Sequence, residues 1–182
     1  MSYNYCIQKK WIYNRSQEIL SGGKNMDVFY VKTLLFAYAG LDDVILSIDE
    51  QVGRKAINSR TNYSPAISQF EEIIALTNEK EIILAVKLVC DTVLGKFSEE
   101  DLTLFRYKYF GTLDEMEELL LDTTSRTYFR RQERLFNRFA RRVENLGIDD
   151  DFFVKKCLSV DFFKQIYEEL TCLDQTESEE IK

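Results

Sequence analysis

Arginine is the residue whose placement could do chemistry in this sequence. The chain has 182 residues, 11 arginines and a formal net charge of −7, and seven of the arginines lie in the 18 residues from Ser125 to Arg142. Glu133 is the only acid in that window, so the window carries +6 and the rest of the chain −13. Guanidinium groups bind phosphates and guanine edges through paired hydrogen bonds. The segregation of charge therefore favours contact with a polyanion.

A helix through this window would separate the arginines from the apolar residues. At about 100° per residue, the arginines span an arc of roughly 160°. They are Arg126, Arg130, Arg131, Arg134, Arg138, Arg141 and Arg142. The apolar residues fall on the opposite side: Tyr128, Phe129, Leu135, Phe136, Phe139, Ala140, Val143 and Leu146. One face is predicted to pack on protein and the other to present guanidinium groups.

Three interpretations of the cationic face are open. Four of its arginines repeat at i, i+4 with one sign, which costs stability in an isolated helix. Nucleic acid is the interpretation we favour. The alternatives are pairing with acidic residues of the same chain or a partner, for example Asp114–Glu118, and a plain solvated face.

The residues before the arginines indicate a helix-turn-helix. Two capped helices are expected over Thr112–Leu121 and Thr124–Leu146, separated by a short turn, with Ser98–Phe110 as a preceding helix capped by Ser98. The start of the second helix would meet base edges through Ser125, Arg126, Thr127, Arg130 and Arg131. The later arginines Arg134, Arg138 and Arg141 would lie nearer the phosphates.

These residues also resemble known DNA-binding families. The run YKYFGTLDEMEELL, continued by TSRTYFRRQERLFNRFARRV, resembles sigma factor region 4. Its SRTYFRRQ part is more similar to ArpU/RinA-type phage and prophage transcription regulators. The resemblance covers roughly residues 96–147 and implies a transcription regulator of a phage, prophage or mobile element. The turn departs from many such motifs because it has Leu121-Asp122 where glycine is common.

Composition argues against an enzyme. The chain has no histidine, no glycine-rich phosphate loop and no paired CxxC among its four cysteines, so no catalytic dyad, cofactor or metal is expected. No apolar run is long enough to span a bilayer, and the first residues lack the apolar segment of a signal peptide. We therefore expect a cytoplasmic protein without a membrane partner.

The expected fold is all-α, because the chain has one proline, and all of its seven glycines except Gly53 follow apolar periodic segments. Residues 1–95 are predicted to form a helical bundle that serves dimerisation or polymerase contact. Residues 96–148 would be the DNA-binding domain, 149–173 a terminal amphipathic helix and 174–182 an acidic tail. Within the bundle, one helix is expected to run to Leu94 or to break near Thr77-Asn78, and Ile82–Val89 is expected to be its most buried segment.

Three functional hypotheses follow. The first is a regulator that binds double-stranded DNA, with RNA polymerase and a second copy of the chain as further partners. The second is a helical interaction protein, such as an anti-sigma or RNA-polymerase-binding factor, whose arginine face docks on an acidic protein. The third, a nuclease, is disfavoured because the carboxylates show no clustered motif.

Overall fold

The computed structural model describes residues 26–58, 66–111 and 125–180, and every element in them is helical. This confirms the all-α prediction. The predicted helix Thr112–Leu121 and its turn lie outside the described residues. The helix-turn-helix therefore stays a prediction.

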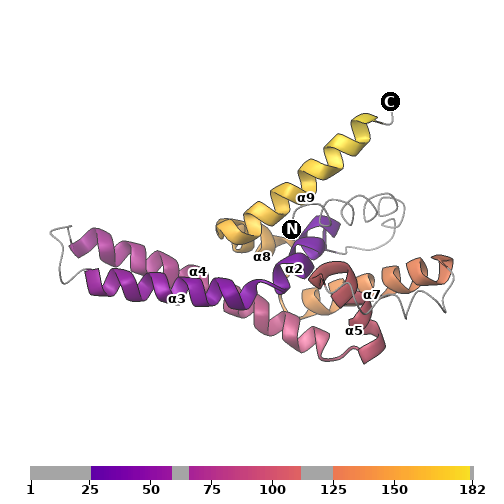
Figure 1. The fold of residues 1–182 in the computed structure, drawn as a ribbon, viewed down its shortest axis with the longest axis horizontal. Helices are drawn as coiled ribbons and strands as arrows, with labels where there is room; N and C mark the ends of the chain where they lie inside the picture. Colours follow the sequence, from indigo (N-terminus) through magenta and orange to yellow (C-terminus); the bar gives the residue numbers. More distant parts are fainter. Residues whose placement is uncertain (1–25, 59–65, 112–124, 181–182) are drawn as a thin grey trace.

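Helix α2 (Val28–Tyr38) lies at the centre of the fold (Figure 1). It begins at Asp27, whose carboxylate accepts a 2.7 Å hydrogen bond from the Phe29 N–H, as N-cap residues do. Val31, Leu34 and Leu35 are fully buried. Helix α9 (Asp161–Glu180) crosses α2, and the ring of Tyr30 stacks on Phe153 with centroids 4.3 Å apart. The core is therefore built around α2.

Helices α3 (Leu41–Asn58) and α4 (Ala66–Leu94) form an antiparallel hairpin that projects from the body as a long arm (Figure 1). Three ion pairs connect the two helices along the arm: Asp42–Lys87, Asp49–Lys80 and Lys55–Glu72. From one pair to the next, the residue number rises on α3 and falls on α4. The apolar interior between them includes Ile48 and Ile83. Both the register and the antiparallel sense follow from these contacts.

Helix α4 runs unbroken through Thr77, whose hydroxyl donates to the Ile73 carbonyl at 2.8 Å. The prediction that Ile82–Val89 is the most buried segment was wrong. Ile83 and Val86 are fully buried, but Leu84 and Leu88 are 43 % and 68 % exposed. The arm is only two helices thick in this region, so one side of α4 has no neighbour within the described residues.

Beyond the arm, α5 (Glu99–Phe105) continues directly into a π-helix, η1 (Arg106–Phe110), that ends at Gly111 with a positive φ of 83°. The sequence did not reveal this π-helix. It packs on α2, where Phe36 and Tyr109 meet edge to face with ring centroids 5.1 Å apart. Lys32 of α2 is buried, and burial together with Lys32 lowers the pKa of Lys108 to about 7.

Helix α7 (Ser125–Asn145) is followed by α8 (Asp150–Lys155), the 3-10 turn η2 (Cys157–Ser159) and α9. The predicted single terminal helix over 149–173 was therefore wrong in detail. Val160 is buried, as is Cys157, and its backbone is extended. This extended residue ends η2 before α9 begins at Asp161. Helix α9 continues to Glu180, into the predicted acidic tail.

The described helices on both sides of the predicted boundary near residue 95 share one core. Phe105, from the second predicted domain, packs on Tyr109 and Phe139, while Val93 and Leu94 of α4 belong to the same buried cluster. None of the helices in the described part of the chain has the length and apolar character that spanning a bilayer requires.

Candidate nucleic-acid interface

The apolar face of α7 is anchored in the core. Phe139 and Val143 are fully buried, and Leu135 and Ala140 nearly so. Phe139 lies against Phe105, with ring centroids 5.9 Å apart. Leu146 was predicted on this face but is 44 % exposed, because α7 ends at Asn145 and the chain turns at Gly147. The inward face is thus fixed over most of the helix, and the arginine face is held in one orientation.

One end of the arginine arc is engaged with α5. The Arg131 guanidinium donates to the Asp101 carboxylate through Nη2 at 2.8 Å and Nε at 3.2 Å, and to Glu100 at 3.1 Å. These hydrogen bonds, that to Asp101 foremost, raise the pKa of Arg131. Arg138 lies 3.7 Å from the second Asp101 oxygen. We call Glu100 and Asp101 the acidic clamp.

Phe97 provides a second contact for this end of the arc. The guanidinium carbons of Arg138 and Arg142 lie 5.2 Å and 4.9 Å from the centre of its ring, within the range of cation–π attraction. Arg142 also donates to the Lys96 carbonyl at 3.4 Å. Arg131, Arg138 and Arg142 therefore bind α7 to the segment that joins α4 to α5.

The other end of the arc is open. Its members are Arg126, Arg130, Arg134 and Arg141, which span roughly 80° of the helix surface at about 100° per residue. All four are exposed, and none forms an ion pair with a carboxylate among the described residues. The Arg134 Nε donates to the Arg130 carbonyl at 3.3 Å, along the helix itself. We call these four residues the arginine ridge.

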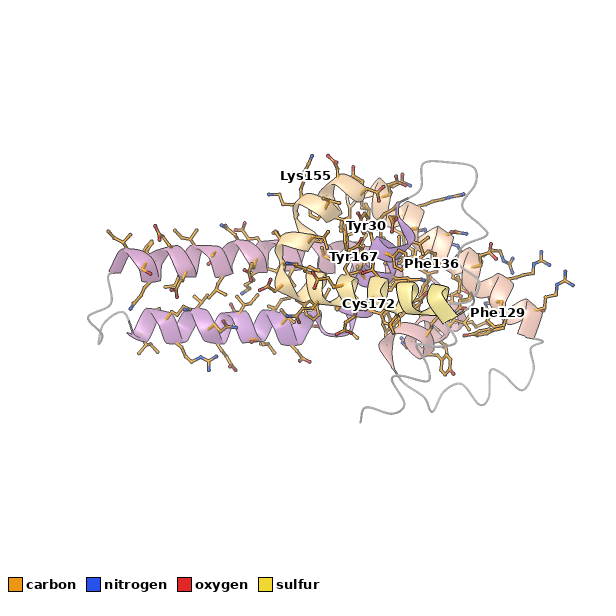
Figure 2. The ribbon with its side chains drawn as sticks, turned by 90° about the horizontal axis from the view of Figure 1, so that it is seen from above. Tyr30, Phe129, Phe136, Lys155, Tyr167 and Cys172 are labelled. Carbon is orange, nitrogen blue, oxygen red and sulfur yellow. The ribbon has the colours of Figure 1, made fainter. Side chains whose placement is uncertain are left out.

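The ridge runs along most of α7, from Arg126 near its first residue to Arg141 near its last. Helix α7 begins at the end of the molecule farthest from the α3–α4 tip and runs back toward the body (Figure 1). Figure 2 shows Phe136 and Phe129 following one another toward that outer end, with nitrogen-tipped side chains projecting beyond them. The outer end of α7 therefore lies away from the arm.

The predicted site residues divide accordingly. Arg126, Arg130, Arg134 and Arg141 form the open ridge, and Thr127 is exposed beside it. Arg131 and Arg138 are held by the acidic clamp. Ser125 is the first residue of α7, and its side chain is outside the description. The alternative partner for the arginines, Asp114–Glu118, also lies outside the described residues.

Sequence reasoning identified Asp101 as part of a capping box but missed its role toward Arg131. Ser98 does cap α5, since its hydroxyl accepts from the Asp101 N–H at 3.3 Å. The Asp101 carboxylate bonds to Arg131, 30 residues away. The only signal in the sequence was the acidic run Glu99-Glu100-Asp101 at a helix start. That signal does not identify Arg131 as the partner, because only the fold brings the run beside α7.

No group of three or more His, Cys, Asp or Glu side chains in the described ranges is arranged to hold a metal ion. Burial raises the pKa of Cys90 and of Cys157 to about 12, so both buried thiols stay protonated at neutral pH. The arrangement on α7 is suited to binding an anion through fixed guanidinium groups. Comparison of this chain with models of protein families, with curated proteins and with solved structures finds no match.

Proposed function

We propose that this chain is a DNA-binding transcription regulator of phage, prophage or mobile-element genes that contacts double-stranded DNA through α7. The observation that carries the proposal is the arginine ridge: four exposed arginines without carboxylate partners among the described residues, on a helix whose other face is buried. A helix anchored in this way presents its guanidinium groups together on one face, where they can contact the phosphates of a duplex. The resemblance to sigma factor region 4 and to ArpU/RinA-type regulators supports the same function.

The contacts of Arg131 and Arg138 with Asp101 lead us to propose different roles for the arginines of α7. Arg126 and Arg130, near the start of the helix, are the proposed base-reading residues, as in other recognition helices. Arg134 and Arg141 are proposed to bind phosphates. Arg131 was predicted to meet base edges and Arg138 to lie near the phosphates, but a DNA contact from either would have to replace its interaction with Asp101. We therefore assign these two a positioning role on the free protein.

The acidic balance of the chain supports selective binding. With a net charge of −7, the protein as a whole is repelled by a duplex, and only a surface oriented like the ridge gains from close approach. Loose contact in other orientations is disfavoured. The proposal therefore expects preference for particular sequences over general coating of DNA.

Selection from a random double-stranded DNA pool at two salt concentrations tests the proposal. We expect enriched sequences and weaker binding at the higher salt. Arg130→Ala should relax base preference at one position and cost about 1–3 kcal/mol, whereas Arg141→Ala should weaken all sequences alike. Arg54→Ala is the matched control, since Arg54 is an exposed arginine on α3. Absence of both enrichment and salt dependence would rule the proposal out.

A second candidate function follows from the acidic clamp. Arg131 already donates to two carboxylates side by side, so the neighbouring ridge could bind an acidic protein surface in the same way. The protein would then be an anti-sigma or RNA-polymerase-binding factor. Recovery of polymerase subunits after nuclease treatment, with no gel shift on the selected DNA pool, would favour this function over the first.

A further inference from the structure

A second exposed surface lies on α4, and it is apolar. Ile67, Phe70, Ile74, Leu84 and Leu88 are between 43 % and 75 % exposed, although each is a large hydrophobic residue. With the exposed Thr77 and Glu81 they repeat at alternating intervals of three and four residues, which places them on one stripe of the helix. We call these seven residues the α4 seam. It extends over about 32 Å of helix at 1.5 Å per residue.

The seam is separate from the surface that α4 uses to pack within the chain. Ile83, Val86 and Cys90 are buried against the rest of the fold, and Lys80 and Lys87 reach across to α3. Figure 1 shows the arm free of other described helices over most of its length. A continuous apolar stripe of this length on a monomer marks an interaction surface.

The order of residues along the seam identifies its partner. We infer that the α4 seam pairs with the α4 seam of a second copy of this chain in an antiparallel arrangement. A two-fold axis beside Glu79 sets Phe70 opposite Leu88 of the second copy and Ile74 opposite its Leu84. The same axis sets Thr77 opposite Glu81. The four apolar residues from Phe70 to Leu88 then meet one another across the axis, as an isologous interface allows, while Ile67 lies opposite Asp91 of the second copy.

The central pair of residues selects the antiparallel sense. Parallel pairing in register would bring Glu81 against Glu81 of the second copy and place two carboxylates together at the interface, which is unfavourable. Antiparallel pairing separates these carboxylates by about 6 Å along the axis and sets each of them opposite Thr77, whose hydroxyl already donates to the Ile73 carbonyl. The flanking Lys80 and Lys87 are already paired with Asp49 and Asp42 of their own chain.

The shape of the molecule permits this pairing. The arm joins the body at the carboxyl end of α4, where the Tyr38 hydroxyl donates to Asp91 at 2.6 Å. An antiparallel pair therefore places the two bodies toward opposite ends of the paired arms. The pairing itself does not depend on the proposed DNA binding.

Sedimentation of the full chain without DNA tests the inference. Over about 1–100 µM protein, a range that covers weak and moderate dimers, we expect monomer to convert to dimer. Phe70→Glu and Leu88→Glu should each raise the dissociation constant at least about 10-fold, since each would bury charge at the interface. Both side chains are exposed in the monomer, so the thermal midpoint of a dilute sample should not change. Glu81→Leu should tighten the dimer.

Val154→Glu is the matched control, because Val154 is 48 % exposed on α8, outside the seam. It should leave the dissociation constant unchanged. A chain that stays monomeric throughout the range, or whose dimer withstands both seam substitutions, overturns the inference. A monomer that instead captures another protein through the seam overturns it as well. Random-pool DNA selection is independent of these outcomes, so the two proposals can fail separately.

Cysteine cross-linking tests the orientation. In a Cys6→Ser, Cys172→Ser background, Ile74→Cys and Leu84→Cys variants are mixed and oxidised. The antiparallel register predicts a disulfide between the two variants. Dimers that form only within the Ile74→Cys variant alone would indicate parallel pairing and contradict the assigned register.

Discussion

The outward faces of α7 and α4 differ in a way that separates two kinds of partner. Helix α7 turns four arginines to solvent, whereas α4 turns five large apolar side chains to solvent. Ions screen attraction to a charged surface, but salt does not weaken the burial of apolar surface. The two proposed binding surfaces should therefore respond differently to salt.

The largest expected effect is on the free energy of unfolding, and it should distinguish a buried hydrophobic residue of α7 from an exposed one of α4. Phe139→Ala should lower the free energy of unfolding by about 3–5 kcal/mol, because the fully buried ring of α7 would leave a cavity. Leu88→Ala on α4 should change it by less than about 0.5 kcal/mol in the monomer. Urea unfolding of dilute protein measures both. Equal losses for the two variants would mean that the α4 seam is covered within the monomer.

Lys108 is a buried cation, in contrast to the solvent-exposed arginines of the ridge. Burial and Lys32 lower its pKa to about 7, so between about pH 7 and its ordinary value of 10.5 the unfolded chain binds a proton that the folded chain does not. The free energy of unfolding should therefore rise as the pH increases through this window. Lys108→Met should remove most of this rise and stabilise the protein at pH 7 by on the order of 3 kcal/mol.

Chemical denaturation at pH 7 and pH 9.5 measures how steeply the free energy of unfolding rises with pH. Lys156→Met serves as its control, because Lys156 is exposed on the surface after α8. The control variant should keep the slope of the wild-type chain. A wild-type stability that stays flat between the two pH values would show that the Lys108 ammonium is solvated.

Salt should separate the two outward faces directly. If each chain neutralises about four phosphates through the arginine ridge, raising salt from about 50 to 200 mM should weaken DNA binding about 100-fold. The dissociation constant of the α4-mediated dimer should change less than about threefold. Fluorescence anisotropy with labelled DNA and sedimentation without DNA give the two values. Similar salt dependence of both equilibria would contradict the assignment of the two surfaces.

The smallest expected effect concerns the acidic clamp. Asp101→Asn should lower the free energy of unfolding by about 1–2 kcal/mol, because Asp101 is mostly buried and holds Arg131. Glu100→Gln should cost less than about 0.5 kcal/mol, since Glu100 is 81 % exposed. Thermal unfolding compares them. Tighter DNA binding by Asp101→Asn would show that the clamp withholds Arg131 and Arg138 from the duplex.

Local patterns predicted much of the fold. The Ser98 cap of α5 and the two-sided α7 follow from residue types and 3.6-residue periodicity, whereas the uninterrupted α4 was one of two alternatives that the sequence left open. The break at Val160 and the exposed side of Ile82–Val89 could not be predicted this way. Periodicity indicates that a residue is apolar, but not whether the fold places a neighbour over it.

The candidate site divides in the same manner. Periodicity alone placed the arginines on one face of α7. It could not distinguish Arg131 from Arg134, because the difference comes from Asp101, which is distant in sequence and reaches α7 only in the folded chain. Which arginines remain open is therefore a property of tertiary structure.

The packing of α2 under α9 also determines when the chain can fold. Helix α2 lies near the start of the described residues, while the helix that covers it lies at their end, and the Asp27 N–H bonds to the Asp150 carboxylate at 2.8 Å across 123 residues. On a translating ribosome, α2 is made well before its cover. The part of its apolar surface that α9 covers stays exposed until α9 has left the exit tunnel, so the native core is completed late and this interval carries a risk of aggregation.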